Sequence, residues 1–144
     1  MFSKACEYGI RAAIFIACQS VQSRKVGLKE VAKEIDSPES YTSKILQKLV
    51  KNEVVLSEKG PTGGFSIEQS ILHDLNLEKV VVAIDGDQIF KGCGLGLKQC
   101  NAIKPCPLHD SFKEVRDKLQ ILLQTTTVLE LAEKIEYGLG FLKR

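Results

Sequence analysis

The sequence lacks a long apolar run and a closely spaced pair of cysteines. No run approaches the roughly 20 apolar residues that cross a bilayer, and the N-terminus does not follow the charged-then-apolar pattern of a signal peptide. We therefore expect a cytoplasmic protein with no membrane partner. Thiols stay reduced in that compartment, so the five cysteines indicate metal or redox chemistry more often than structural disulfides.

The net charge is small, and histidine is rare. A net charge of +2 is too small to identify a nucleic-acid binder, so any binding face must come from local arrangement. His73 and His109 are the only histidines, and no Cys-x-x-Cys pair is present. A thiol catalyst or redox enzyme would also need a second site for a substrate, which this short chain does not provide. We therefore expect that the protein is not an enzyme.

The apolar residues that are present follow mostly helical spacing. The chain has 144 residues, of which 44% are hydrophobic, and this suffices for one domain with an appended helix. Cys6 and Cys18 follow the apolar pattern of the first helix, so we expect both to be small buried residues. The predicted helices span residues 3–21, 28–35, 38–51, 75–85, 108–127 and 128–135.

Residues 28–51 have the pattern of two helices joined by a tight turn. Ser37 followed by Pro38 predicts a helix that begins with a hydroxyl cap and a proline. The outward face of this second helix carries small polar and basic residues, which can approach phosphates and base edges. A solvated helix in an ordinary bundle would share this pattern, so the two helices alone leave both interpretations open.

A short hairpin follows directly, with predicted strands at 54–57 and 65–67. The connection at 58–64 contains three glycines and a proline, as expected for the tip of a wing. It lacks the ending and the following helix of a nucleotide-binding P-loop. We therefore predict a mainly α fold with a small β-hairpin wing, that is, a winged helix-turn-helix domain. The predicted DNA-binding residues are Ser37, Ser40, Tyr41, Ser43, Lys44, Lys48, Lys59, Gly60 and Thr62.

Three of the cysteines lie in a stretch rich in glycine and proline. Cys93, Cys100 and Cys106 are followed by His109 at a spacing of three. Glycine and proline disfavour regular structure, so this loop can bend its thiolates around one metal centre. Zinc would take a tetrahedral set of three thiolates and one imidazole, but it usually uses more closely spaced cysteines. The wider spacing favours an iron–sulfur cluster, and three unligated thiols are the remaining possibility.

The apolar spacing in the last long helix predicts that this helix packs against the same helix of a second copy. Its apolar residues step by four and three, which is the spacing of a coiled-coil seam, although the stripe could also pack on its own core. A long helix after a small winged domain more often packs against its twin, so we expect a homodimer. The predicted seam consists of Leu108, Phe112, Val115, Leu119 and Leu122. We divide the chain into a DNA-binding domain (1–86), a cysteine loop (87–107) and a dimerisation helix with a C-terminal tail (108–144).

Several stretches together resemble the Rrf-two superfamily of bacterial winged-helix regulators, over nearly the whole chain. They are Ser-Lys-Ala-Cys-Glu-Tyr-Gly-Ile-Arg-Ala at 3–12, Ser37-Pro38 with Tyr41, the wing at 59–65, and Cys106-Pro-Leu-His109. The resemblance implies a homodimer that binds a double-stranded DNA operator through the third helix and the wing. In the cysteine-bearing branches it also implies an iron–sulfur sensor, of 2Fe–2S or 4Fe–4S type. Lys59 stands where the family usually has Arg, and Ser43 where some members have Glu, which leaves the target sequence open.

The resemblance offers two candidates for the fourth cluster ligand. His109 follows Cys106 as in one branch, whereas Glu7 lies where another branch carries an Asp that reaches a 4Fe–4S cluster. We expect a regulator, such as a repressor, whose operator affinity responds to redox state, nitric oxide or iron–sulfur status through the cluster loop. A coupling of about 1–3 kcal/mol suffices for such a switch. The alternative is a metal-free regulator that senses thiol oxidation, a protein or a small molecule.

Overall fold

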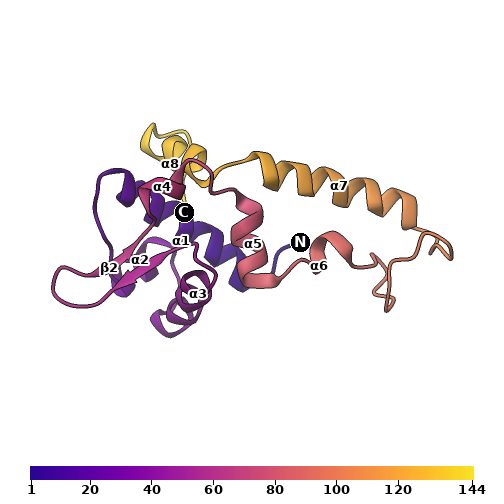
Figure 1. The fold of residues 1–144 in the computed structure, drawn as a ribbon, viewed down its shortest axis with the longest axis horizontal. Helices are drawn as coiled ribbons and strands as arrows, with labels where there is room; N and C mark the ends of the chain where they lie inside the picture. The colour runs from indigo at the N-terminus through magenta and orange to yellow at the C-terminus, as the bar shows by residue number, and fades with distance from the viewer.

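Helices dominate the structure, and one short hairpin interrupts them (Figure 1). The computed structural model describes all 144 residues. This architecture confirms the predicted fold class. The elements are α1 (Lys4–Val21), α2 (Leu28–Glu34), α3 (Glu39–Lys51), β1 (Leu56–Glu58), β2 (Gly64–Ser66), α4 (Gln69–Leu72), α5 (Leu77–Asp85), α6 (Gln88–Lys91), α7 (His109–Thr125) and α8 (Val128–Glu136).

Helix α1 is the centre of the core and contacts α2, α3, α5 and α8. This explains why its apolar residues are not confined to one face. The side chain of Ser3 caps the helix by accepting a hydrogen bond from the Cys6 N–H at 3.0 Å. Cys6 and Cys18 are buried as predicted. Burial raises the pKa of the Cys6 thiol to about 12 and that of Cys18 to about 11, so neither thiol is reactive near neutral pH.

The turn between α2 and α3 differs from the prediction at its cap. Pro38 is the residue that precedes α3, and no side chain caps the helix. The hydroxyl of Ser37 is buried without a hydrogen-bond partner, while its N–H donates to the Ala32 carbonyl at 3.0 Å. The Pro38 carbonyl accepts from both the N–H and the hydroxyl of Thr42, each at 2.9 Å. The predicted Ser37 cap is therefore wrong, and backbone closure of α2 fixes the turn instead.

The hairpin lies slightly further along the chain than predicted. β1 and β2 pair antiparallel, with Leu56 opposite Ser66. Val54 and Val55 are buried but follow the end of α3, where their N–H groups donate to the Leu49 carbonyl at 2.9 and 3.3 Å. Gly64 has φ +139°, and a Cβ there would lie 2.8 Å from the Val26 carbonyl oxygen, so this close strand contact requires glycine.

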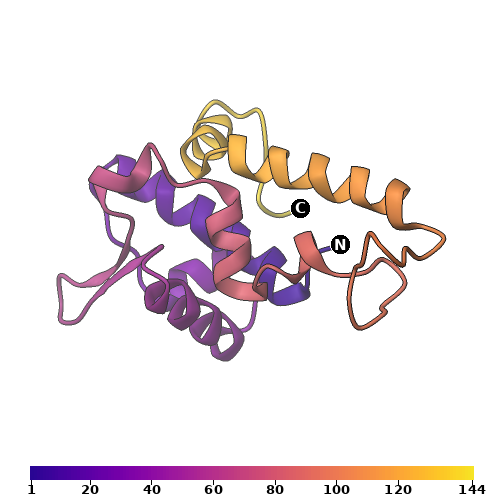
Figure 2. The ribbon, with the colours of Figure 1, turned by 45° about the vertical axis from the view of Figure 1, so that its right-hand side comes forward.

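Helix α7 extends away from the body of the molecule, and the cysteine loop lies at its far end (Figures 1 and 2). The chain reaches this loop through α6 and returns along α7, and α8 then packs against α1. Cys18 Sγ lies 3.6 Å from the Ala132 carbonyl oxygen, and Val128 is fully buried. Sequence periodicity predicted α7 and α8 but not the short helices α4 and α6. None of the helices has the length and apolar character that a membrane span requires.

Candidate cysteine centre and nucleic-acid interface

The structure brings the four residues of the predicted cysteine centre together as two pairs. Cys93 Sγ lies 3.9 Å from Cys106 Sγ, and Cys100 Sγ lies 3.4 Å from His109 Nδ1. All four side chains are partly buried. No three cysteine, histidine or carboxylate side chains converge closely enough to hold one metal ion. The single-ion tetrahedron that zinc would need is therefore not formed.

Backbone turns orient the first of these sulfurs. The Leu95 N–H lies 3.4 Å from Cys93 Sγ, and the Gly96 N–H donates to the Cys93 carbonyl at 2.9 Å. Hydrogen bonds from the backbone N–H groups of Leu95 and Leu97 lower the pKa of the Cys93 thiol. A thiol held in this way ionises more readily, and the thiolate is the form that binds metals and attacks electrophiles.

One stripe of α7 faces the cysteine loop and consists of His109, Phe112 and Arg116. The Arg116 guanidinium donates to Cys100 Sγ at 3.2 Å through Nη2 and to the Gly92 carbonyl through Nη1. Phe112 packs on Gly94, where a Cβ would lie only 2.6 Å from the ring. Sequence analysis missed Arg116, although its position two helical turns after His109 indicates the same face of the helix.

The close approach of Gly94 to Phe112 gives a prediction. A Gly94→Ala variant should destabilise the protein by about 1–2 kcal/mol, because the added methyl group overpacks this contact. Urea unfolding measures the loss, and hydrogen exchange should show faster exchange in the cysteine loop. Gly140→Ala is the control, since a Cβ there would meet only Ile135 Cδ1, at an ordinary contact distance of 3.6 Å. Equal stability of the two variants would contradict the prediction.

Glu7, the alternative ligand, does not join the cysteine centre within one chain. Its carboxylate forms an ion pair with Lys4 at 3.1 Å. Nearby, the Ser3 N–H donates to the Asp85 carboxylate at 3.1 Å and so fastens the start of α1 to the end of α5. The start of α1 is thus attached to the last residue of α5, which lies just before α6 and the cysteine loop in the sequence.

The predicted dimerisation residues differ in how far the chain itself covers them. Leu119 is half-buried against the core, and Phe112 lies on the cysteine loop. Leu108, Val115 and Leu122, which recur every seven residues, are 44%, 56% and 57% exposed. We call these three residues the exposed seam. It is an apolar face that no other part of this chain covers.

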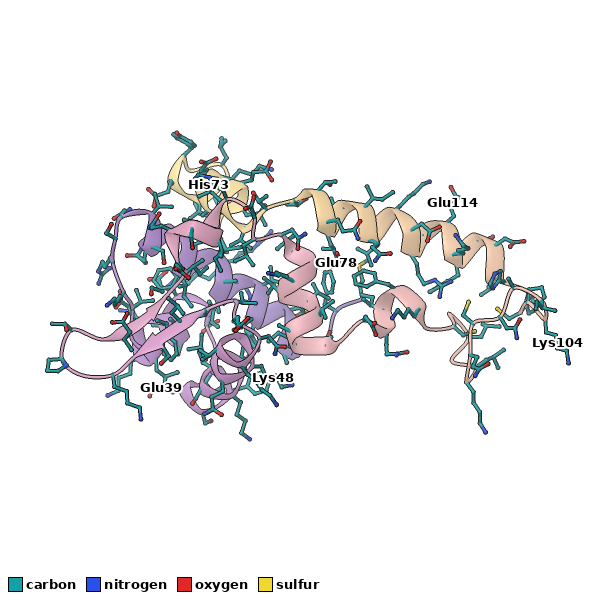
Figure 3. All side chains as sticks on the ribbon, viewed as in Figure 1. Glu39, Lys48, His73, Glu78, Lys104 and Glu114 are labelled. Atoms are coloured by element: carbon teal, nitrogen blue, oxygen red, sulfur yellow. The ribbon has the colours of Figure 1, made fainter.

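The predicted DNA-contacting residues lie mainly on the outward side of α3 and at the tip of the hairpin. Tyr41 and Ser43 are half-buried, and Ser37 lies in the turn that precedes α3. In Figure 3, Lys48 on α3 and Lys104 in the cysteine loop lie at widely separated parts of the molecule. The cysteine loop and α3 therefore do not form one continuous site. The exposed members of the set are Ser40, Lys44, Lys48, Lys59, Gly60 and Thr62.

Tyr41 has a packing role that sequence analysis did not predict. Its ring meets the Tyr8 ring edge-on, with centroids 5.6 Å apart. The Arg11 guanidinium lies 4.5 Å from the Tyr8 centroid, and its Nη1 donates to the Ile35 carbonyl at 3.0 Å. These contacts join α1 to the end of α2 and to α3, so they fix the orientation of the helix-turn-helix.

This arrangement predicts a cost for removing Arg11. An Arg11→Met variant should lose about 1–2 kcal/mol of unfolding free energy, because both the ring contact and the hydrogen bond to Ile35 disappear. Urea denaturation measures this. Lys4→Met is the matched control, because Lys4 lies 5.7 Å from the Tyr8 ring and is exposed. A loss as large in the control would refute the assigned role of Arg11.

Two helices joined by a tight turn, a glycine-tipped hairpin and a long outer helix define a winged-helix transcriptional regulator. The chain belongs to the Rrf2 family: the family's sequence profile, described as "Iron-dependent Transcriptional regulator", matches residues 2–134. This confirms the family that sequence analysis identified.

Relatives and solved structures agree with this assignment. The chain is 29% identical over 134 residues to a putative HTH-type transcriptional regulator of Aquifex aeolicus, covering 91% of this chain and 90% of the relative. It is 26% identical over 129 residues to the HTH-type transcriptional regulator IscR of Pectobacterium carotovorum, covering 90% and 77%.

Two solved structures share the fold at low sequence identity. CymR, the global cysteine regulator of B. subtilis, matches with a TM-score of 0.74 at 18% identity, covering 92% of this chain and 96% of that one. T. potens IscR matches with a TM-score of 0.73 at 18% identity, covering 96% and 90%. These relatives are regulators, and no catalytic family is indicated.

Proposed function

We propose that the protein is a homodimeric regulator whose affinity for a double-stranded DNA operator is controlled by an iron–sulfur cluster. The proposed ligands are Cys93, Cys100, Cys106 and His109. The observation that carries this proposal is their arrangement as two close pairs rather than as four scattered side chains. We keep the division at 1–86, 87–107 and 108–144, with α8 packed on the first unit.

The spacing within each pair suits one tetrahedral metal. Two thiolates at about 2.3 Å from such a metal lie roughly 3.8 Å apart, and a thiolate and an imidazole lie roughly 3.5 Å apart. The pair Cys93–Cys106 measures 3.9 Å and the pair Cys100–His109 measures 3.4 Å. Each pair could hold one iron, so the two pairs together would supply the four ligands of a 2Fe–2S cluster. We therefore favour this cluster type, with His109 rather than Glu7 as the fourth ligand.

A bound cluster would make the shape of the loop depend on redox state and iron supply. Contacts within the chain connect the cysteine loop, through α7 and α5, to the DNA-binding domain. Cys106 lies three residues before the start of α7, and the Gln120 side chain on α7 donates to Glu78 of α5 at 2.9 Å. At the other end of α5, Asp85 holds the start of α1. A shift of α7 would therefore change the separation of the two recognition helices in a dimer, and about 1–3 kcal/mol of coupling is enough.

The test begins with protein purified without oxygen. We expect visible absorption with stoichiometric iron and sulfide, and a change in affinity when the cluster is removed. The duplex for this measurement is selected from a random pool, and binding is followed by fluorescence anisotropy at fixed salt. Failure to take up iron and sulfide, even after reconstitution, would exclude the cluster. Unchanged DNA affinity would exclude its regulatory role.

Thiol oxidation is a second candidate, and the short distance between Cys93 and Cys106 favours it. Hydrogen peroxide would accept two electrons and two protons from these thiols, forming one disulfide and two water molecules. In that case the anaerobic protein is colourless. Its DNA affinity changes with peroxide and returns with dithiothreitol, and peptide mapping finds Cys93 joined to Cys106.

A further inference from the structure

Arg116 is the one Lys, Arg, Asp or Glu side chain that the structure buries. It is 8% exposed, and no carboxylate pairs with it. A buried guanidinium is costly unless hydrogen bonds and negative charge compensate it. The source of that compensation therefore indicates what Arg116 is placed to do.

The contacts of Arg116 lead to the cysteine centre. Nη2 donates to Cys100 Sγ at 3.2 Å, and Nη1 donates to the carbonyl of Gly92, the residue before Cys93. Nε is buried and has no partner. The planar fork of a guanidinium can hold two acceptors at a fixed separation, which an ammonium group cannot do. Arg116 thus connects Cys100, and the backbone just before Cys93, to α7.

We propose that Arg116 is a positioning residue of the cysteine centre, which holds Cys100 in place and supplies the positive charge that a thiolate-ligated cluster needs. This inference rests on the proposed function. A cationic donor beside a cluster thiolate stabilises the more negative, reduced state and so raises the reduction potential. The fork also keeps the loop closed on α7 before any metal arrives.

Three variants separate these roles. Arg116→Met removes the charge and both hydrogen bonds, while Arg116→Lys keeps the charge without the fork. Lys118→Met is the matched control, because it removes the same charge from the same helix at an exposed site where Lys118 pairs with Glu114 at 2.7 Å. Thermal unfolding of the metal-free proteins checks folding. Spectroelectrochemistry then gives the reduction potential, and iron and sulfide analysis gives the occupancy.

We expect Arg116→Met to have a lower reduction potential than wild type, with Lys118→Met unchanged. Both Arg116 variants should hold less iron, and Arg116→Lys should have the potential nearer to that of wild type. If Arg116→Met folds but holds no iron, the lost iron supports the role of Arg116 in positioning Cys100. The reduction potential is then measured on Arg116→Lys instead. An iron-loaded Arg116→Met with the potential of Lys118→Met would overturn this inference alone. A wild-type protein without iron and sulfide would overturn the proposed function and this inference with it.

Discussion

Cys93→Ala protein purified without oxygen should be colourless, whereas Cys18→Ala protein should keep full visible absorption, iron and sulfide. Both variants remove one thiol, but only Cys93 belongs to a pair spaced for a metal. The pKa of Cys93 is lowered by backbone N–H groups, which favours the ligating thiolate. Burial raises the pKa of Cys18 to about 11, so its thiol stays protonated and does not bind the metal. Absorption spectra with iron and sulfide assays make this comparison.

The same variant tests the link from the cluster to DNA. The affinity of Cys93→Ala should equal that of wild type without its cluster and should differ 5- to 150-fold from cluster-loaded wild type, the range of a coupling of about 1–3 kcal/mol. Cys18→Ala should retain the full response. A Cys93→Ala protein that still binds stoichiometric iron would remove Cys93 from the site. If the variant and the loaded wild type bind DNA equally, the centre is structural rather than regulatory.

Much of the fold was predictable because its elements are encoded locally. The spacing of apolar residues predicted α1, α3, α5 and α7 within a few residues, and the glycines at 60, 63 and 64 predicted the wing. The strands were placed early because Val54 and Val55 have strand-like composition, yet their burial follows from the turn after α3. Ser37 was expected as a cap, since local pattern does not show that the turn closes on the Ala32 carbonyl.

The site was only partly predictable, because its geometry comes from contacts between distant segments. Sequence spacing identified Cys93, Cys100 and Cys106 but could not show that the first and third pair with each other. It also could not show that Arg116 is buried against the loop, because a lone arginine in a charged helix is ordinarily solvated. Phe112 fitted the heptad pattern, although its ring packs on Gly94.

The exposed seam leads to a second prediction of large effect. Val115→Glu should be monomeric and should lose operator affinity by about 10²–10⁴-fold, because a charge in an apolar interface is costly and one recognition helix binds without its twin. Val115 is 56% exposed in the single chain, so the substitution should leave the fold intact. Lys113→Gln is the control, since it changes net charge equally on another side of α7, where Lys113 pairs with Asp117 at 2.5 Å.

Sedimentation and anisotropy measurements on these two variants test the dimer, and a dimeric Val115→Glu with normal affinity would refute the seam. The monomer also tests the ligand set. Cys93, Cys100, Cys106 and His109 lie in one chain and pair within it, so monomeric Val115→Glu should still bind iron and sulfide. Glu7 pairs with Lys4 within the chain, so we expect it to act as a ligand only from the partner subunit. A monomer that loses its cluster would therefore shift the fourth ligand from His109 to Glu7, whereas a brown monomer with weak DNA binding would separate sensing from dimerisation.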